Sequence, residues 1–114
     1  MHELSIALSI IDEVEEQVQR HDGAAVEAIY LRIGALSGVD VRALRFAWEL
    51  ASENTPFALS RLEIEFVALL VYCPQCNTTH MPSPQSIMCP RCMTPEQQII
   101  EGRELEVRAL ELAA

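Results

Sequence analysis

The chain has 114 residues, half of them hydrophobic, which suits one domain or a domain with a small appendage and a core that does not need disulfides. Its formal charge of −9 argues against nucleic acid or an anionic membrane surface as a partner, and suits cations or a basic protein patch. Because no signal peptide or transmembrane run is visible, we expect a cytoplasmic protein with reduced thiols.

The first predicted element is a helix that begins near Leu4 and ends at the stop signal formed by Arg20, His21 and Gly23. Its apolar stripe consists of Leu4, Ala7, Leu8, Ile11, Val14 and Val18. Since Ile6 and Ile10 widen this stripe, we expect the helix to be covered on more than one side.

Strand periodicity follows over residues 26–33, and a second helix is predicted over residues 41–52 with Asp40 as its N-cap. The apolar face of this helix consists of Leu44, Ala47, Trp48 and Ala51, with Phe46 and Leu50 beside it. Alternation predicts a second strand over residues 60–69 and a last strand over residues 104–112. In that last strand Leu105, Val107 and Ala109 share one face.

This order of elements predicts an α+β fold in which two helices pack on a small mixed β-sheet and the last strand returns to that sheet. The segment before it, about residues 71–94, is rich in Pro, Ser, Thr and Asn and poor in large apolar side chains. Something other than hydrophobic burial must therefore hold this segment, which we expect to form an inserted second lobe.

Two CxxC pairs, Cys73/Cys76 and Cys89/Cys92, lie within this segment and are separated by twelve residues. Each pair can form a tight turn, and two such turns supply four thiolates around one centre, the ligand set of a structural Zn²⁺. The segment is therefore predicted to be a zinc-ribbon (rubredoxin-like) lobe whose metal binding provides its folding energy.

Other readings of the four cysteines are weaker or remain open. Disulfides do not suit a reducing compartment, and a thioredoxin-like site needs one CxxC rather than two. Iron in the same geometry remains an alternative to zinc. Four thiolates leave no position for a catalytic water, and we expect His80 to be a solvent-exposed loop residue rather than a competing ligand.

The start of the chain, Met1-His2-Glu3, is a second candidate metal site. On residue chemistry alone, a histidine at this position is usually an ordinary surface residue. The alternative is chelation of one metal by the Met1 amine, the His2 amide nitrogen and the His2 imidazole, with a Glu3 oxygen nearby. Nitrogen-rich coordination of this kind suits Ni²⁺ or Cu²⁺ better than Zn²⁺.

Several stretches resemble the HypA/HybF family of hydrogenase nickel-incorporation proteins. They are the opening Met1–Ile6 with Ser9-Ile10, Leu31–Val39, Leu44–Glu49, the two CxxC pairs at this spacing, and Gly102–Leu105. The resemblance covers nearly the whole chain. The N-terminal triplet together with the double CxxC is its specific part.

The resemblance implies a nickel metallochaperone, not an enzyme, that binds Ni²⁺ at its N-terminus and delivers it for maturation of [NiFe]-hydrogenase. Residues 1–69 and 103–114 would form the nickel-binding domain and residues 70–102 the zinc-binding domain. Nickel would be held by Met1, His2 and Glu3, and structural zinc by Cys73, Cys76, Cys89 and Cys92. The implied partners are a HypB-type nickel GTPase, the hydrogenase large subunit and, for some members, urease accessory proteins.

Asp40 occupies a position where some family members supply a further nickel ligand, although helix N-cap is the better supported role here. An alternative function also stays open, namely a zinc-ribbon interaction module that carries no transition metal. We expect the protein to be a monomer or a dimer.

Overall fold

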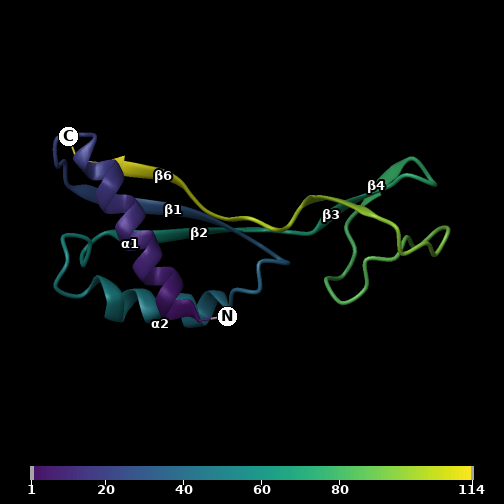
Figure 1. Cartoon of the computed structure of the whole chain (residues 1–114), viewed down its shortest axis with the longest axis horizontal. Helices are drawn as coiled ribbons and strands as arrows, with labels where there is room; N and C mark the ends of the chain where they lie inside the picture. Colours follow the sequence, from purple (N-terminus) through teal and green to yellow (C-terminus); the bar gives the residue numbers. More distant parts are fainter. Residues whose placement is uncertain (1, 114) are drawn as a thin grey trace. The chain divides into compact units, whose positions relative to one another are not determined.

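The computed structural model describes residues 2–113, and Figure 1 shows its helices and strands. The elements in chain order are α1 (Glu3–Gln19), β1 (Val26–Gly34), α2 (Val41–Ser52), β2 (Arg61–Val67), β3 (Leu70–Cys73), β4 (Thr78–His80), β5 (Gln98–Glu101) and β6 (Leu105–Leu112). Both predicted helices are therefore confirmed, as are the three long strands. The predicted Asp40 N-cap is confirmed too, because one carboxylate oxygen of Asp40 accepts the N–H groups of Arg42 and Ala43 at 3.0 and 3.2 Å.

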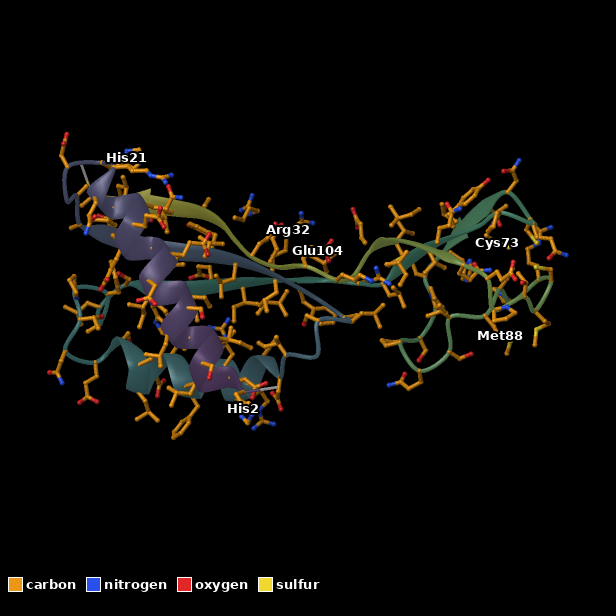
Figure 2. The ribbon with its side chains drawn as sticks, in the orientation of Figure 1. His2, His21, Arg32, Cys73, Met88 and Glu104 are labelled. Carbon is orange, nitrogen blue, oxygen red and sulfur yellow. The ribbon has the colours of Figure 1, made fainter. Side chains whose placement is uncertain are left out.

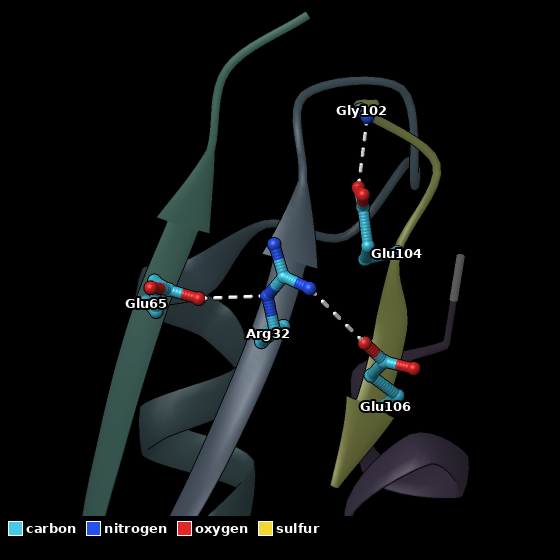
Figure 3. Close-up of polar contacts among 5 residues, drawn as sticks. All are labelled: Arg32, Glu65, Gly102, Glu104 and Glu106. Atoms are coloured by element: carbon cyan, nitrogen blue, oxygen red, sulfur yellow. Dashed lines mark hydrogen bonds and ion pairs between the residues drawn. The ribbon is translucent and has the colours of Figure 1, made fainter. Parts of the chain in front are cut away.

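The three long strands form one sheet in the order β2-β1-β6. In Figure 3 the arrowheads of β1 and β2 point the same way and that of β6 points the opposite way. The sheet is therefore mixed, as predicted. β1 and β2 form a parallel pair joined through α2, while β6 returns antiparallel, with the Gly34 N–H donating to the Glu104 carbonyl at 2.8 Å.

The apolar core is built mostly from aliphatic side chains, with Trp48 and Phe57 as its buried aromatic residues, in keeping with the scarcity of aromatic residues in the sequence. α1 and α2 pack on each other and bury the residues at helical spacing along their inner faces. These are Ala7, Ile10, Ile11 and Val14 on α1, and Leu44, Ala47 and Trp48 on α2. Burying each of the large side chains contributes on the order of 1.5–3 kcal/mol to stability.

Two details of the predicted apolar faces are wrong. Leu4 and Leu8 belong to the predicted stripe of α1, yet each is 49% exposed, because the buried face is centred on Ala7, Ile10, Ile11 and Val14. In β6 the half-buried residues are Val107, Leu110 and Leu112, whereas Leu105 and Ala109 are exposed. Strict alternation therefore does not describe which side chains of β6 face the core.

The cysteine segment contains a second three-stranded sheet, in the order β4-β3-β5, that the sequence did not predict. β3 pairs antiparallel with both neighbours, with Tyr72 opposite Thr79 on one side and Gln98 on the other. The predicted second strand is also divided: β2 ends at Val67 and β3 begins at Leu70. These strands are only three or four residues long, so periodicity could not reveal them.

Contacts divide the chain into two compact units. The first comprises residues 2–31, Val39–Ile64 and residues 107–113, and contains both helices. The second comprises Arg32–Gly38 and Glu65–Glu106, and contains the second sheet and all four cysteines. This division differs from the predicted nickel-binding and zinc-binding domains, whose boundaries stay a prediction.

Polar contacts and close packing fix the ends of the long strands within the second unit (Figure 3). The Arg32 guanidinium donates to Glu65 at 2.7 Å and lies 3.7 Å from Glu106, and the hydrogen bond that Arg32 donates to Glu65 raises the pKa of Arg32. The Glu104 carboxylate accepts the Gly102 N–H at 2.8 Å. The structure therefore ties all three strands together at this level of the sheet.

Neither helix in residues 2–113 has both the length and the apolar character needed to cross a lipid bilayer.

Candidate metal centre

The four cysteine sulfurs converge on one point in the second unit. The four sulfur atoms all lie within 4.8 Å of one another, and no cysteine in the chain is in a disulfide. The Sγ atoms of Cys73 and Cys92 are 3.7 Å apart, and those of Cys76 and Cys89 are 3.8 Å apart. A tetrahedral zinc with bonds of about 2.3 Å requires sulfurs about 3.8 Å apart, so the arrangement fits this ion.

Matched turns place the two cysteine pairs. In each turn the residue after the second cysteine donates its N–H to the carbonyl of the first, Asn77 to Cys73 and Met93 to Cys89, both at 2.8 Å. Asn77 and Met93 both adopt the left-handed backbone conformation, with φ of 58° and 62°. Asparagine tolerates this conformation better than an unbranched apolar residue does, so the second turn is the more strained.

The thiols of the cluster differ in pKa. A hydrogen bond from the Gln97 side chain, with help from the Cys76 N–H, lowers the pKa of Cys73 to about 6. Contact with the Cys92 thiol, together with burial, raises the pKa of Cys76 to about 12. The backbone N–H of Cys92 also lowers the pKa of Cys89. The first cysteine of each pair is thus held closer to the thiolate form that binds metals.

Two polar residues of the second unit, His80 and Gln97, have surroundings that the sequence did not reveal. His80 is in strand β4 and only half exposed, and both of its ring nitrogens are buried without a hydrogen-bond partner among residues 2–113. The prediction of a solvent-exposed loop histidine is therefore wrong. The metal-binding group found in these residues contains the four cysteines and no histidine. Gln97, which bonds Cys73, follows no ligand spacing that would have identified it.

The second candidate site lies at the start of α1, in the first unit. Met1 falls outside the described residues. His2 is exposed and is the N-cap residue of α1, and its side chain makes no capping hydrogen bond. Figure 2 shows His2 at this end of the helix and His21 beyond the other end. The His2 imidazole is therefore in a position to bind a ligand.

Glu3 and Asp40 are brought together at the same place. One Glu3 carboxylate oxygen accepts the backbone N–H of Asp40 at 3.2 Å, which ties the first turn of α1 to the N-cap of α2. The structure thus places His2, Glu3 and Asp40 near one another, although they are far apart in the sequence. It leaves the capping role of Asp40 intact, because the same carboxylate satisfies two backbone donors of α2.

Comparison with known proteins gives a consistent result. The family model described as hydrogenase/urease nickel incorporation, metallochaperone, hypA matches residues 1–112. A hydrogenase maturation factor HypA of Chloroflexus aggregans is 48% identical over 112 residues, which cover 97% of this chain and 98% of that protein. The corresponding protein of Deinococcus radiodurans is 38% identical, with 94% and 89% covered.

A solved structure also matches over the full length. The solution structure of the Ni metallochaperone HypA from Helicobacter pylori superposes with a TM-score of 0.70 at 25% identity, and the match covers 100% of this chain and 99% of that chain. Together with the four-cysteine cluster, these matches show that the chain belongs to the HypA family of nickel-incorporation metallochaperones that serve hydrogenase maturation.

Proposed function

We propose that this metallochaperone carries Ni²⁺ at its N-terminus, with the Met1 amine, the His2 amide and imidazole nitrogens, and a Glu3 oxygen as ligands. The observation that carries the proposal is the junction of the two helix starts, where an exposed imidazole with no capping bond lies beside the bonded Glu3 and Asp40. Nitrogen and oxygen donors at an exposed chain end suit a cargo that must be bound and later released.

The Asp40 carboxylate already caps α2 by accepting two backbone N–H groups, so we do not include it among the proposed nickel ligands. We therefore assign nickel binding to Met1, His2 and Glu3, and treat Asp40 as the residue that positions Glu3 through its backbone N–H. An incoming metal would compete with this N–H for the Glu3 carboxylate. Binding would then loosen the link between the starts of α1 and α2.

Zinc is the proposed resident ion of the four cysteines, and its role is structural. The sulfur separations of 3.7 and 3.8 Å suit a tetrahedral S₄ site, and the closed donor set leaves no position for substrate or water. Iron would also accept this set. Metal analysis of the protein purified without added metals distinguishes the two, and we expect about one zinc per chain and no visible absorption from iron.

The proposed mechanism is binding and handover, with no bond chemistry on a substrate. Membership of the family implies partners in hydrogenase maturation. Within that group we propose a HypB-type nickel GTPase as the partner that drives transfer, the [NiFe]-hydrogenase large subunit as the acceptor, and urease accessory proteins as a second route. Because the four cysteines form no disulfide, they suit a reducing compartment, and we place the protein in the cytoplasm.

A calorimetric nickel titration tests the N-terminal site. The variants are native protein, His2→Ala, and a protein with extra residues before Met1, and His21→Ala serves as a matched control because His21 is exposed at the other end of α1. We expect His2→Ala and the extension before Met1 to remove the tight nickel site, and His21→Ala to retain it. Equal uptake by all four proteins would contradict the proposal and favour an interaction module without nickel cargo.

A further inference from the structure

Gln97 stands opposite Cys73 in the small sheet of the second unit. β3 and β5 pair antiparallel, with Tyr72 of β3 opposite Gln98 of β5. One further step of this register brings Gln97, which directly precedes β5, opposite Cys73. Side chains at opposite positions of an antiparallel pair project from the same face, with Cβ atoms about 4.5–5.5 Å apart. The side-chain amide of Gln97 is therefore within hydrogen-bonding reach of the Cys73 sulfur.

The same amide connects the two cysteine pairs. Gln97 Nε2 donates to the Thr94 carbonyl at 3.4 Å, and the Cys89 N–H donates to this same carbonyl at 3.1 Å. Nε2 also donates to the Glu96 carbonyl at 3.1 Å. A hydrogen bond from Gln97 is, in addition, the largest cause of the lowered pKa of Cys73. One side chain thus contacts a sulfur of the first pair and the turn that holds the second pair.

Electron-rich neighbours fix the orientation of this amide. Gln97 is half-buried, and its Oε1 atom is buried without a hydrogen-bond partner among residues 2–113. Exchanging Oε1 with Nε2 would turn the oxygen toward the carbonyls of Thr94 and Glu96 and the Cys73 sulfur, all of which are acceptors. The donor end therefore faces the sulfur. The unpaired Oε1 is a cost that a hydrogen bond to a charged acceptor offsets, so this amide has a role beyond packing.

Thiolates that bind a metal need donors around them. A Zn²⁺ ion bound to four thiolates leaves an excess of about two negative charges on the sulfurs. N–H groups that donate to sulfur spread this charge and reduce the tendency of a thiolate to take up a proton and leave the metal. The Cys76 N–H is one such donor, 3.4 Å from the Cys73 sulfur. Gln97 brings a second donor to this sulfur from outside both cysteine turns.

We propose that Gln97 is a positioning residue of the metal centre, and that its side-chain N–H donates to the Cys73 sulfur and holds this thiolate on the metal. This role rests on the zinc site proposed above. Residues that donate to metal ligands typically contribute 10–100-fold to metal affinity. Because Gln97 also holds the Thr94 carbonyl, it links the retention of the ion by the two cysteine pairs.

The test removes the donor in two ways and measures zinc affinity by competition with a chromophoric chelator. Gln97→Met keeps the length of the side chain without an N–H, and Gln97→Glu replaces the donor with a negative charge. Gln98→Met and Gln98→Glu are the matched controls, because Gln98 is the neighbouring glutamine and is exposed. We expect Gln97→Met to bind zinc about 10-fold more weakly or worse, Gln97→Glu to bind it more weakly still, and both controls to match the native protein.

Cobalt in place of zinc separates donation to sulfur from simple bracing of the turn. Co²⁺ bound to four thiolates has a charge-transfer absorption from sulfur, which moves to lower energy when a hydrogen bond to sulfur is lost. We expect this shift in Gln97→Met and its absence in Gln98→Met.

Two results would overturn the role of Gln97 and leave the zinc site standing. One is native zinc affinity in both Gln97 variants, and the other is weaker affinity with an unshifted cobalt absorption. A native protein whose cobalt spectrum lacks the charge-transfer absorption of four thiolates would instead refute the zinc centre, and the role of Gln97 with it.

Discussion

Replacing Gly34 by alanine should destabilise the protein because the new methyl group has no room. A Cβ at this position would lie 2.2 Å from the backbone carbon and oxygen of Gly102 and 2.6 Å from a carboxylate oxygen of Glu104. Since carbon atoms pack at roughly 3.5 Å, the strands would have to separate by roughly 1.3 Å. The hydrogen bonds from Gly34 N–H to Glu104 and from Leu36 N–H to Gly102, at 2.8 and 2.6 Å, oppose this movement.

The expected loss in the free energy of unfolding is about 3 kcal/mol, the upper end of the range for overpacking, because the obstructing atoms are backbone rather than the end of a side chain. For a domain of this size, that loss lowers Tm by about 12 °C or more. Circular dichroism melts of the zinc-loaded protein measure the change. Spectra at low temperature show whether the variant still folds.

Gly23→Ala is the matched control for backbone conformation. Gly23 has a φ of +71° but nothing within 4 Å of its missing Cβ, so alanine there costs only the strain of the left-handed region, about 1 kcal/mol. Gly34→Ala should therefore lower Tm clearly more than Gly23→Ala. Equal Tm values for the two variants, or a native Tm for Gly34→Ala, would contradict the close approach of Gly34 and Gly102.

Three further predictions concern the caps and the cysteine lobe. Asp40→Ala should lower the free energy of unfolding by about 1 kcal/mol through loss of the cap, whereas Asp40→Asn, which keeps an acceptor oxygen, should stay within a few tenths in urea titrations. Met93→Gly should relieve left-handed strain of about 1 kcal/mol and slow zinc loss to a chelator, and Asn77→Gly should do so less; equal effects would contradict the strain assignment. Cys89→Ala, or chelation of the metal, should broaden or shift the amide signals of residues 70–102 but leave Trp48 emission unchanged, because that buried tryptophan belongs to the first unit; a shift in its emission would show that the two units do not unfold independently.

The long elements could be predicted because their patterns extend over many residues. β1 alternates around Ile29, Leu31 and Ile33, all buried, and α2 has both an apolar face and a capping residue at the expected place. The cysteine spacing likewise predicted the convergence of four sulfurs. These features depend on local chemistry, which the sequence displays directly.

Features that depend on packing between distant segments could not be predicted. The exposure of Leu4, Leu8, Phe46 and Leu50 follows from where the helices meet each other and the sheet, and helical periodicity alone does not distinguish a covered apolar residue from an uncovered one. The burial of the His80 nitrogens and the hydrogen bond between Gln97 and Cys73 also depend on segments that are distant in the sequence, and the strands of this segment are too short for their periodicity to be recognised. The bond between Glu3 and Asp40 joins two helix starts that are 37 residues apart.

The measurement that tests the central claim most directly is X-ray absorption at the zinc and nickel edges of one sample that carries both ions. The account predicts zinc surrounded by four sulfurs at about 2.3 Å and nickel surrounded by nitrogen and oxygen alone. Sulfur ligands on the nickel, or nickel displacing zinc from the cysteines, would contradict a division between one ion that holds the fold and another that is delivered.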